Sequence, residues 1–166
     1  MSAQNILKIS VLAAAMGLVS SGAFAGDSAT QDVGYGVSAI NEIAIDSDLS
    51  DTISLTVATA TAGSQPDAVT QSSDYDITTN GTDKKISAAI NTAMPDDVTL
   101  SLTATAPTGG TSAGKLGLTA TAQDVVSGIT KVAETGIALQ YELSALVTAG
   151  TVESASKTVT LTIIDG

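Results

Sequence analysis

The chain is poor in the residues that carry most enzyme chemistry. Its 166 residues include no cysteine, histidine, tryptophan or arginine, and aromatic residues make up 2% of the total. Without histidine, the abundant serine and threonine hydroxyls lack their usual activating base, and no recognisable motif surrounds any of the lysines. Without cysteine, no disulfide supports the fold, so packing and backbone pairing must stabilise it. These absences predict a protein that is not an enzyme.

The first 25 residues have the pattern of a secretory signal peptide. Lys8 precedes an apolar run over residues 9–19, and small residues end in Ala23-Phe24-Ala25, an A-x-A cleavage site. The apolar run is well short of the roughly 20 residues that span a bilayer as a helix. We therefore expect residues 1–25 to be removed and the mature protein, starting near Gly26, to have no membrane span. Its predicted location is extracellular, at the cell surface or in the periplasm.

Cleavage leaves a strongly acidic chain. The full sequence has a formal charge of −11, and the loss of Lys8 makes it −12, because all 17 acidic residues follow the cleavage site. Nucleic acids and anionic membranes bind proteins mainly through clustered lysine and arginine. We expect neither as a partner.

Apolar and polar residues alternate along most of the mature chain. After a flexible polar leader, residues 26–32, the odd positions of residues 33–45 are apolar except at Asn41, which predicts a long first strand. Residues 75–90 are interpreted as a hairpin with an extended loop, and residues 124–129 as a turn or short helix. Further strands are expected at residues 53–57, 98–104, 116–122, 137–147 and 158–164. The pattern predicts one all-β domain over residues 26–166, an immunoglobulin-like β-sandwich of about seven to nine strands.

Three details of this sandwich follow from the same alternation. Tyr35 and Tyr141 fall on the apolar faces of their strands, which favours the core over a ligand contact. Gly34 and Gly36 weaken a strand unless a bulge or a close backbone approach requires them. The C-terminal strand is expected to pair with residues 136–147 across the loop at Gly150, whether or not its outer edge also frames a groove for a neighbouring chain.

One acidic loop is a candidate metal site. Asp46, Asp48 and Asp51 lie close together between two predicted strands, and clustered carboxylates on a loop are the ligands that Ca²⁺ prefers. The stretch departs from the EF-hand loop, because it has no glycine at the sixth position and no glutamate at the twelfth. An acidic β-turn explains the same residues. Calcium is the one cofactor that the sequence suggests.

Two further short motifs have simpler explanations. Asp96 and Asp97 follow Pro95 and fit a solvated turn better than a pair of catalytic carboxylates. The tripeptide Asn80-Gly81-Thr82 fits a glycosylation sequon, but a turn explains it equally well.

The layout of residues 33–164 resembles the cysteine-free fimbrial pilins, small all-β subunits of bacterial surface fibres. The shared features are a signal peptide, an alternating N-terminal strand and a threonine-rich C-terminal strand. Local similarity lies at Ile77-Thr78-Thr79-Asn80 and Lys84-Lys85-Ile86. The resemblance implies an adhesive pilus or fimbrium subunit that self-associates through β-strand pairing, its N-terminal extension filling a groove in the next subunit.

The donor strand implied by this resemblance carries Val33, Tyr35, Val37 and Ala39 on one face. Two interpretations fit the segment, since it is suited equally to be the first strand of its own sandwich. The predicted function is therefore a structural subunit of an extracellular fibre, and the alternative is a monomeric secreted binding or adhesion module, assisted by calcium.

Overall fold

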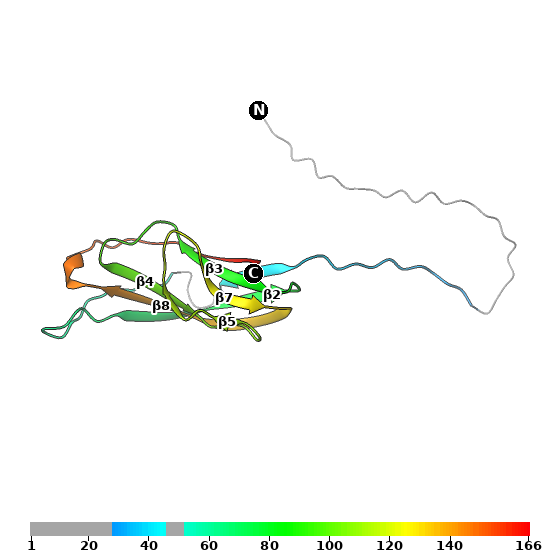
Figure 1. Ribbon diagram of the computed structural model, residues 1–166, viewed down its shortest axis with the longest axis horizontal. Helices are drawn as coiled ribbons and strands as arrows, with labels where there is room; N and C mark the ends of the chain where they lie inside the picture. The colour runs from blue at the N-terminus through cyan, green and yellow to red at the C-terminus, as the bar shows by residue number, and fades with distance from the viewer. Residues whose placement is uncertain (1–27, 46–51) are drawn as a thin grey trace, which may run out of the picture. The chain divides into compact units, whose positions relative to one another are not determined.

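Nine β-strands and one short 3₁₀ turn, but no α-helix, form the described part of the chain, residues 28–45 and 52–166 of a computed structural model (Figure 1). The strands alternate with loops that are rich in glycine, threonine and aspartate. Their bounds are β1 (Asn41–Ile45), β2 (Val69–Thr79), β3 (Lys84–Ile90), β4 (Val98–Ala104), β5 (Thr111–Ser112), β6 (Lys115–Gly117), β7 (Gln123–Ile129), β8 (Val132–Ala145), η2 (Val147–Ala149) and β9 (Val159–Asp165).

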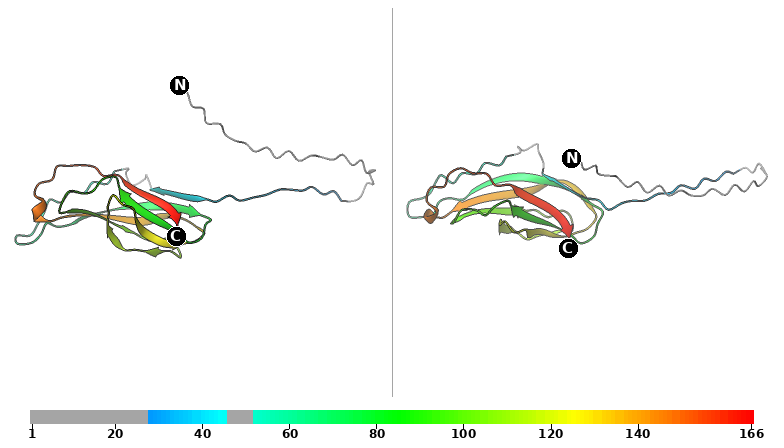
Figure 2. Two further views of the ribbon diagram at one scale, coloured as in Figure 1. Left: turned by 45° about the horizontal axis from the view of Figure 1, so that its top comes forward. Right: turned by 90° about the horizontal axis from the view of Figure 1, so that it is seen from above.

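The strands form two antiparallel sheets that pack face to face as a β-sandwich (Figure 2). One sheet has the order β1-β2-β8-β4-β6, and the other has the order β5-β7-β3-β9. The predicted all-β sandwich is confirmed, with its strand number at the upper end of the predicted range.

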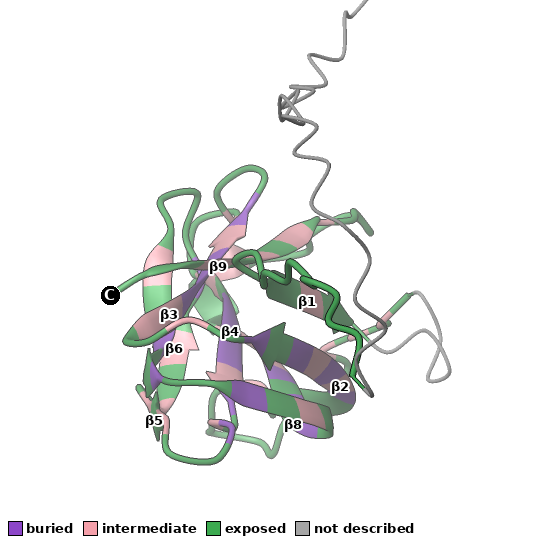
Figure 3. Cartoon of the chain, turned by 90° about the vertical axis from the view of Figure 1, so that its right-hand side faces the viewer, coloured by how far each residue is buried: buried purple, intermediate pink, exposed green. Residues whose placement is uncertain are grey.

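The core is built from the inward-facing positions of both sheets. Figure 3 shows buried residues gathered on β2, β4 and β8, whereas β1 is almost entirely exposed. Tyr141 is buried, as the alternation predicts. The largest fully buried side chains are Tyr75, Ile77, Ile86, Leu102, Val125, Val126, Ile129 and Leu139.

The chain divides into two units, residues 1–36 and 37–166. In the first unit, residues 28–36 form neither helix nor strand and are exposed. The second unit contains the whole sandwich. Over the described ranges, no helix is both long and apolar enough to cross a bilayer.

Four predictions about the N-terminal half are wrong. The first strand covers only Asn41–Ile45 rather than residues 33–45, and Tyr35 is 98% exposed rather than in the core. Gly34 and Gly36 are in no bulge, and nothing lies within 4 Å of a Cβ added at either. Residues 53–57 keep alternating exposure but join no strand.

Pairing between strands also differs from the sequence prediction. β2 and β3 form no hairpin, because β2 pairs with β1 and β8 while β3 pairs with β7 and β9 in the other sheet. The C-terminal strand β9 pairs with β3, with Ile163 opposite Ile86, instead of with β8. Residues 124–129 belong to strand β7 rather than to a turn or helix.

Tyr75 supplies the first testable prediction. It is fully buried, and its hydroxyl donates a 2.7 Å hydrogen bond to the carbonyl of Thr105. Tyr75→Phe removes this bond and should lower the free energy of unfolding by about 1 kcal/mol at pH 7. Urea unfolding monitored by circular dichroism measures the loss.

The same variant should also change the dependence of stability on pH. Burial, and then the nearby charge of Glu134, raise the pKa of the Tyr75 hydroxyl above its ordinary value. The folded state therefore keeps a proton that the unfolded chain releases above pH about 10, so this stability is complete below pH 10 and is lost above it. Burial raises the pKa of Tyr141 as well, so Tyr75→Phe should reduce the alkaline loss without abolishing it. An unchanged alkaline profile would contradict the assignment.

Candidate functional site

A mainly apolar cleft of about 990 Å³, called the apolar cleft below, opens at one end of the sandwich; serine and threonine side chains, Glu153 and Lys157 also line it. Two chain segments outside the sheets, residues 52–60 and residues 152–158, line it together with β2, β4, β8, the start of β9 and Ile45 of β1. Ile53, Leu55 and Val159 are half-buried and pack against the core from this side. The core is therefore only partly covered where the cleft opens.

The two segments beside the cleft lack the backbone pairing of a sheet. In the described structure, residues 53–58 make no hydrogen bond, and neither do residues 151–156. Water satisfies exposed backbone groups of this kind, but an extended stretch with free N–H and C=O groups is also a template for another strand.

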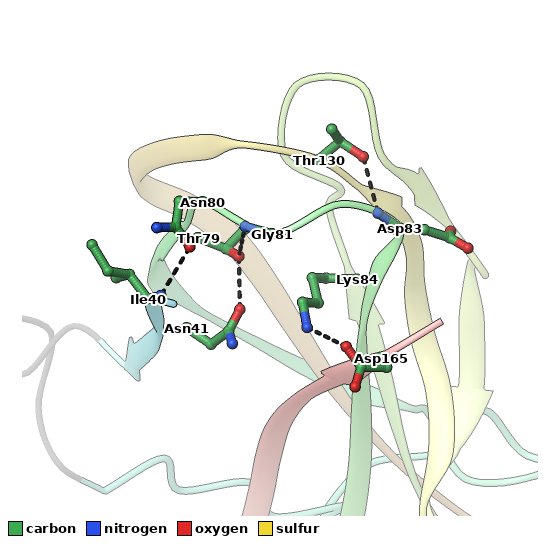
Figure 4. Close-up of polar contacts among 9 residues, drawn as sticks. All are labelled: Ile40, Asn41, Thr79, Asn80, Gly81, Asp83, Lys84, Thr130 and Asp165. Carbon is green, nitrogen blue, oxygen red and sulfur yellow. Dashed lines mark hydrogen bonds and ion pairs between the residues drawn. The ribbon is translucent and has the colours of Figure 1, made fainter. Parts of the chain in front are cut away.

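Asn80 fixes the point where the N-terminal segment enters the sandwich. Its side-chain oxygen accepts a 2.9 Å hydrogen bond from the Ile40 N–H, and its side-chain nitrogen donates a 2.8 Å bond to the Ser38 carbonyl. Next to it, the Thr79 hydroxyl donates to the Asn41 side-chain oxygen at 2.7 Å (Figure 4). Residues 38–41 are thus held at the end of β2.

The residues before this entry point expose large apolar side chains. Val33 is 77% exposed, Tyr35 is 98% exposed and Val37 is 83% exposed, and Ala39 is exposed as well. These are the predicted assembly residues. These side chains make no contribution to the core of their own chain. Exposure of their apolar surface to water is unfavourable unless another surface covers it.

The entry point and most of the cleft lie at opposite ends of the sandwich. Asn41 is opposite Thr79, at the last residue of β2, whereas the cleft starts at Ile45 of β1, opposite Tyr75, and continues past Ser73 and Leu143, which pairs with Val69. Four residues of a strand separate Thr79 from Tyr75, or about 14 Å at roughly 3.4 Å per residue. The entry point at Asn41 therefore lies beyond one end of the cleft.

An ion pair between neighbouring strands of one sheet lies near the entry point. The Lys84 ammonium donates to the Asp165 carboxylate, which links β3 to β9 (Figure 4). This hydrogen bond and the lysine charge lower the pKa of the Asp165 carboxyl. Because the carboxylate is exposed, the pair contributes little to stability. It joins the ends of two paired strands, and this position favours a minor structural role over a catalytic one.

The other predicted site residues have different outcomes. Asp46, Asp48 and Asp51 lie outside the described residues, as do the predicted signal residues 1–25. Among residues that the structure does describe, no group of three or more acidic side chains could hold a metal ion. Asp97 lies in a turn, as predicted, and its φ is 61°. Its carboxylate accepts a hydrogen bond from the Thr148 hydroxyl.

The sequence contains a weak signal for the entry point but none for the cleft. Asn41 interrupts an apolar alternation, and the structure shows that this break marks where the exposed segment becomes strand. The sequence suggests a turn or a glycosylation sequon at Asn80, whereas in the structure both polar atoms of its side chain bind the incoming chain. The cleft itself was missed, because residues 151–158 have no regular pattern and residues 53–57 look like an ordinary strand.

We compared the chain with protein-family models and with curated proteins. No family model matches the chain, and no curated protein matches it in sequence.

Proposed function

We propose that this protein is a non-enzymatic structural subunit of an extracellular or cell-surface fibre, joined to its neighbours by strand donation. The donor is the exposed segment that carries Val33, Tyr35, Val37 and Ala39. The observation that carries the proposal is the opposite placement of the segment's entry point and the apolar cleft.

This placement favours an open assembly. When a donor and an acceptor lie at opposite ends of a subunit, each copy offers a free acceptor after it has bound its neighbour. Such head-to-tail contacts close into a ring only at particular rotations and otherwise produce filaments. A symmetric dimer would leave no free ends, and it needs a surface that is complementary to itself.

The chemistry of the segment also supports donation. Its apolar residues recur at every second position, so an added strand would direct all four of them to one side. Main-chain hydrogen bonds then supply affinity, and the alternate side chains supply specificity. The residues at 34 and 36 are glycines, which place no side chain on the opposite side.

The non-enzymatic and extracellular parts of the proposal rest on the sequence. No histidine or cysteine is available as a base or nucleophile anywhere in the 166 residues. The signal-peptide pattern of residues 1–25 favours export.

Size-exclusion chromatography and electron microscopy of the exported protein test the function. We expect filaments of variable length, with a subunit mass that corresponds to cleavage near Gly26. A protein that stays monomeric at all concentrations, including material taken from the cell surface, would overturn the fibre proposal. The monomeric binding module would then be favoured, and calorimetric titration with calcium would test its metal site at Asp46, Asp48 and Asp51.

A further inference from the structure

We infer that the acceptor is the slot between residues 53–58 and residues 151–159, and that its occupant is residues 33–39 of a second copy of this chain. This inference rests on the proposed function and assigns it a specific binding site. The slot is defined here as the part of the apolar cleft that lies between these two segments.

Backbone chemistry is the first argument. The two segments line the same cleft, and neither residues 53–58 nor residues 151–156 make hydrogen bonds within the described structure. Strand β9 continues the second segment and has only β3 as a strand partner among the described strands. A strand inserted here would have unpaired N–H and C=O groups available on its neighbours, which is the condition for β-augmentation.

The side chains that face the slot supply the second argument. The exposures of residues 52–58 alternate, with Ile53, Leu55 and Val57 half-buried and the residues between them exposed. On the other side, Val159 of β9 lines the cleft and is also half-buried. Apolar residues on both sides of the slot are thus only partly covered, and an apolar strand inserted between them would bury them further.

Length is the third argument, and it favours a second copy over the same chain. Seven residues, 33–39, span about 23 Å when extended, which is similar to the six residues 53–58 at about 20 Å. Within one chain, however, Ile40 is held at Asn80, and the cleft starts only at Ile45, opposite Tyr75, about 17 Å along the strand. A segment folding back from there would bring only its first one or two residues into the cleft.

Cysteine cross-linking of the full mature chain tests the slot. The natural chain has no cysteine, so each introduced thiol is unique. Ser154→Cys places one thiol beside the slot, and a second replaces each donor residue in turn: Val33, Tyr35, Val37 or Ala39. The control combines the same donor changes with Thr111→Cys, an exposed position on β5 at the far edge of the same sheet as β9.

Disulfide formation requires Cβ atoms about 3.5–4.5 Å apart, which only neighbouring segments reach. We expect at least one donor position to give a ladder of linked chains with Ser154→Cys and none to do so with Thr111→Cys. Hydrogen exchange of the unmodified protein provides a second measurement, since amides of residues 53–58 and 151–156 should become protected in filaments and not in monomers.

The outcomes separate the two levels of the proposal. Filaments that cross-link through Thr111→Cys, or that leave both segments unprotected, would overturn the slot and leave the fibre intact. An intramolecular disulfide in a monomer would show that the chain fills its own cleft, and would overturn the second copy as occupant. Absence of any assembly in the unmodified protein would remove the fibre proposal and the slot together.

Discussion

Val37→Asp should abolish filament formation, and Gly36→Asp should leave it largely intact. Both changes add one negative charge to the same exposed segment, so the net charge of the two variants is identical. They differ in the face that carries the charge. At position 37 the carboxylate would enter an apolar slot, and burying an unpaired carboxylate costs several kcal/mol.

The control is suitable because position 36 is open. Nothing lies within 4 Å of a Cβ placed on Gly36, so a side chain there causes no clash in the subunit. Val37 is 83% exposed, so its replacement should not unfold the sandwich either. Sedimentation and electron microscopy of both purified variants measure the effect. Equal loss of filaments in both would indicate that charge alone, and not the inward face, controls assembly.

Deleting residues 28–37 should have the same outcome as Val37→Asp. This deletion stops before Ser38, and it therefore keeps the bonds of Asn80 to Ser38 and Ile40. A deletion through residue 45 would also remove β1, which is an edge strand of the sandwich itself. A synthetic peptide of residues 28–40 should bind the shortened protein and raise its melting temperature. A shortened protein that still forms filaments would contradict the donor assignment.

Leu139→Ala should cause a large loss of stability. Leu139 is fully buried on β8, which pairs with both β2 and β4 at the centre of its sheet. Removing its isopropyl group loses transfer free energy and leaves a cavity, which together cost about 2–5 kcal/mol. Urea unfolding in the Val37→Asp background, where we expect a monomer, measures this loss.

Leu146→Ala is the matched control for this truncation. Its side chain is 48% exposed, so the same chemical change should cost less than about 1 kcal/mol. The backbone hydrogen bond from the Leu146 N–H to the Asp97 carbonyl is retained in the variant. A similar loss at both positions would mean that β8 is not at the centre of the core.

The alternation of apolar and polar residues is enough to predict the fold class and much of the core. Alternation correctly predicted strands at residues 98–104 and near the C-terminus, and it correctly placed Tyr141 in the interior. It succeeded there because side chains of a strand point alternately to two faces, so one apolar face indicates one buried face. β7 was missed because the consecutive residues Val125 and Val126 are both buried, beside irregular pairing between β3 and β7. Such irregularities disturb the period of two.

Tertiary structure alone decided which strands are neighbours and which apolar faces are covered. The period of two shows which face of a strand is buried, but it does not show which strands pair with its two edges. The sequence of β9 is therefore equally compatible with pairing to β3 and to β8. The same limit applies to residues 33–39 and 53–57, whose alternation is that of buried strands. In this chain the first segment is exposed and the second lies unpaired beside a cleft. Edge pairing depends on contacts between residues far apart in the chain, and these contacts leave no local pattern in the sequence.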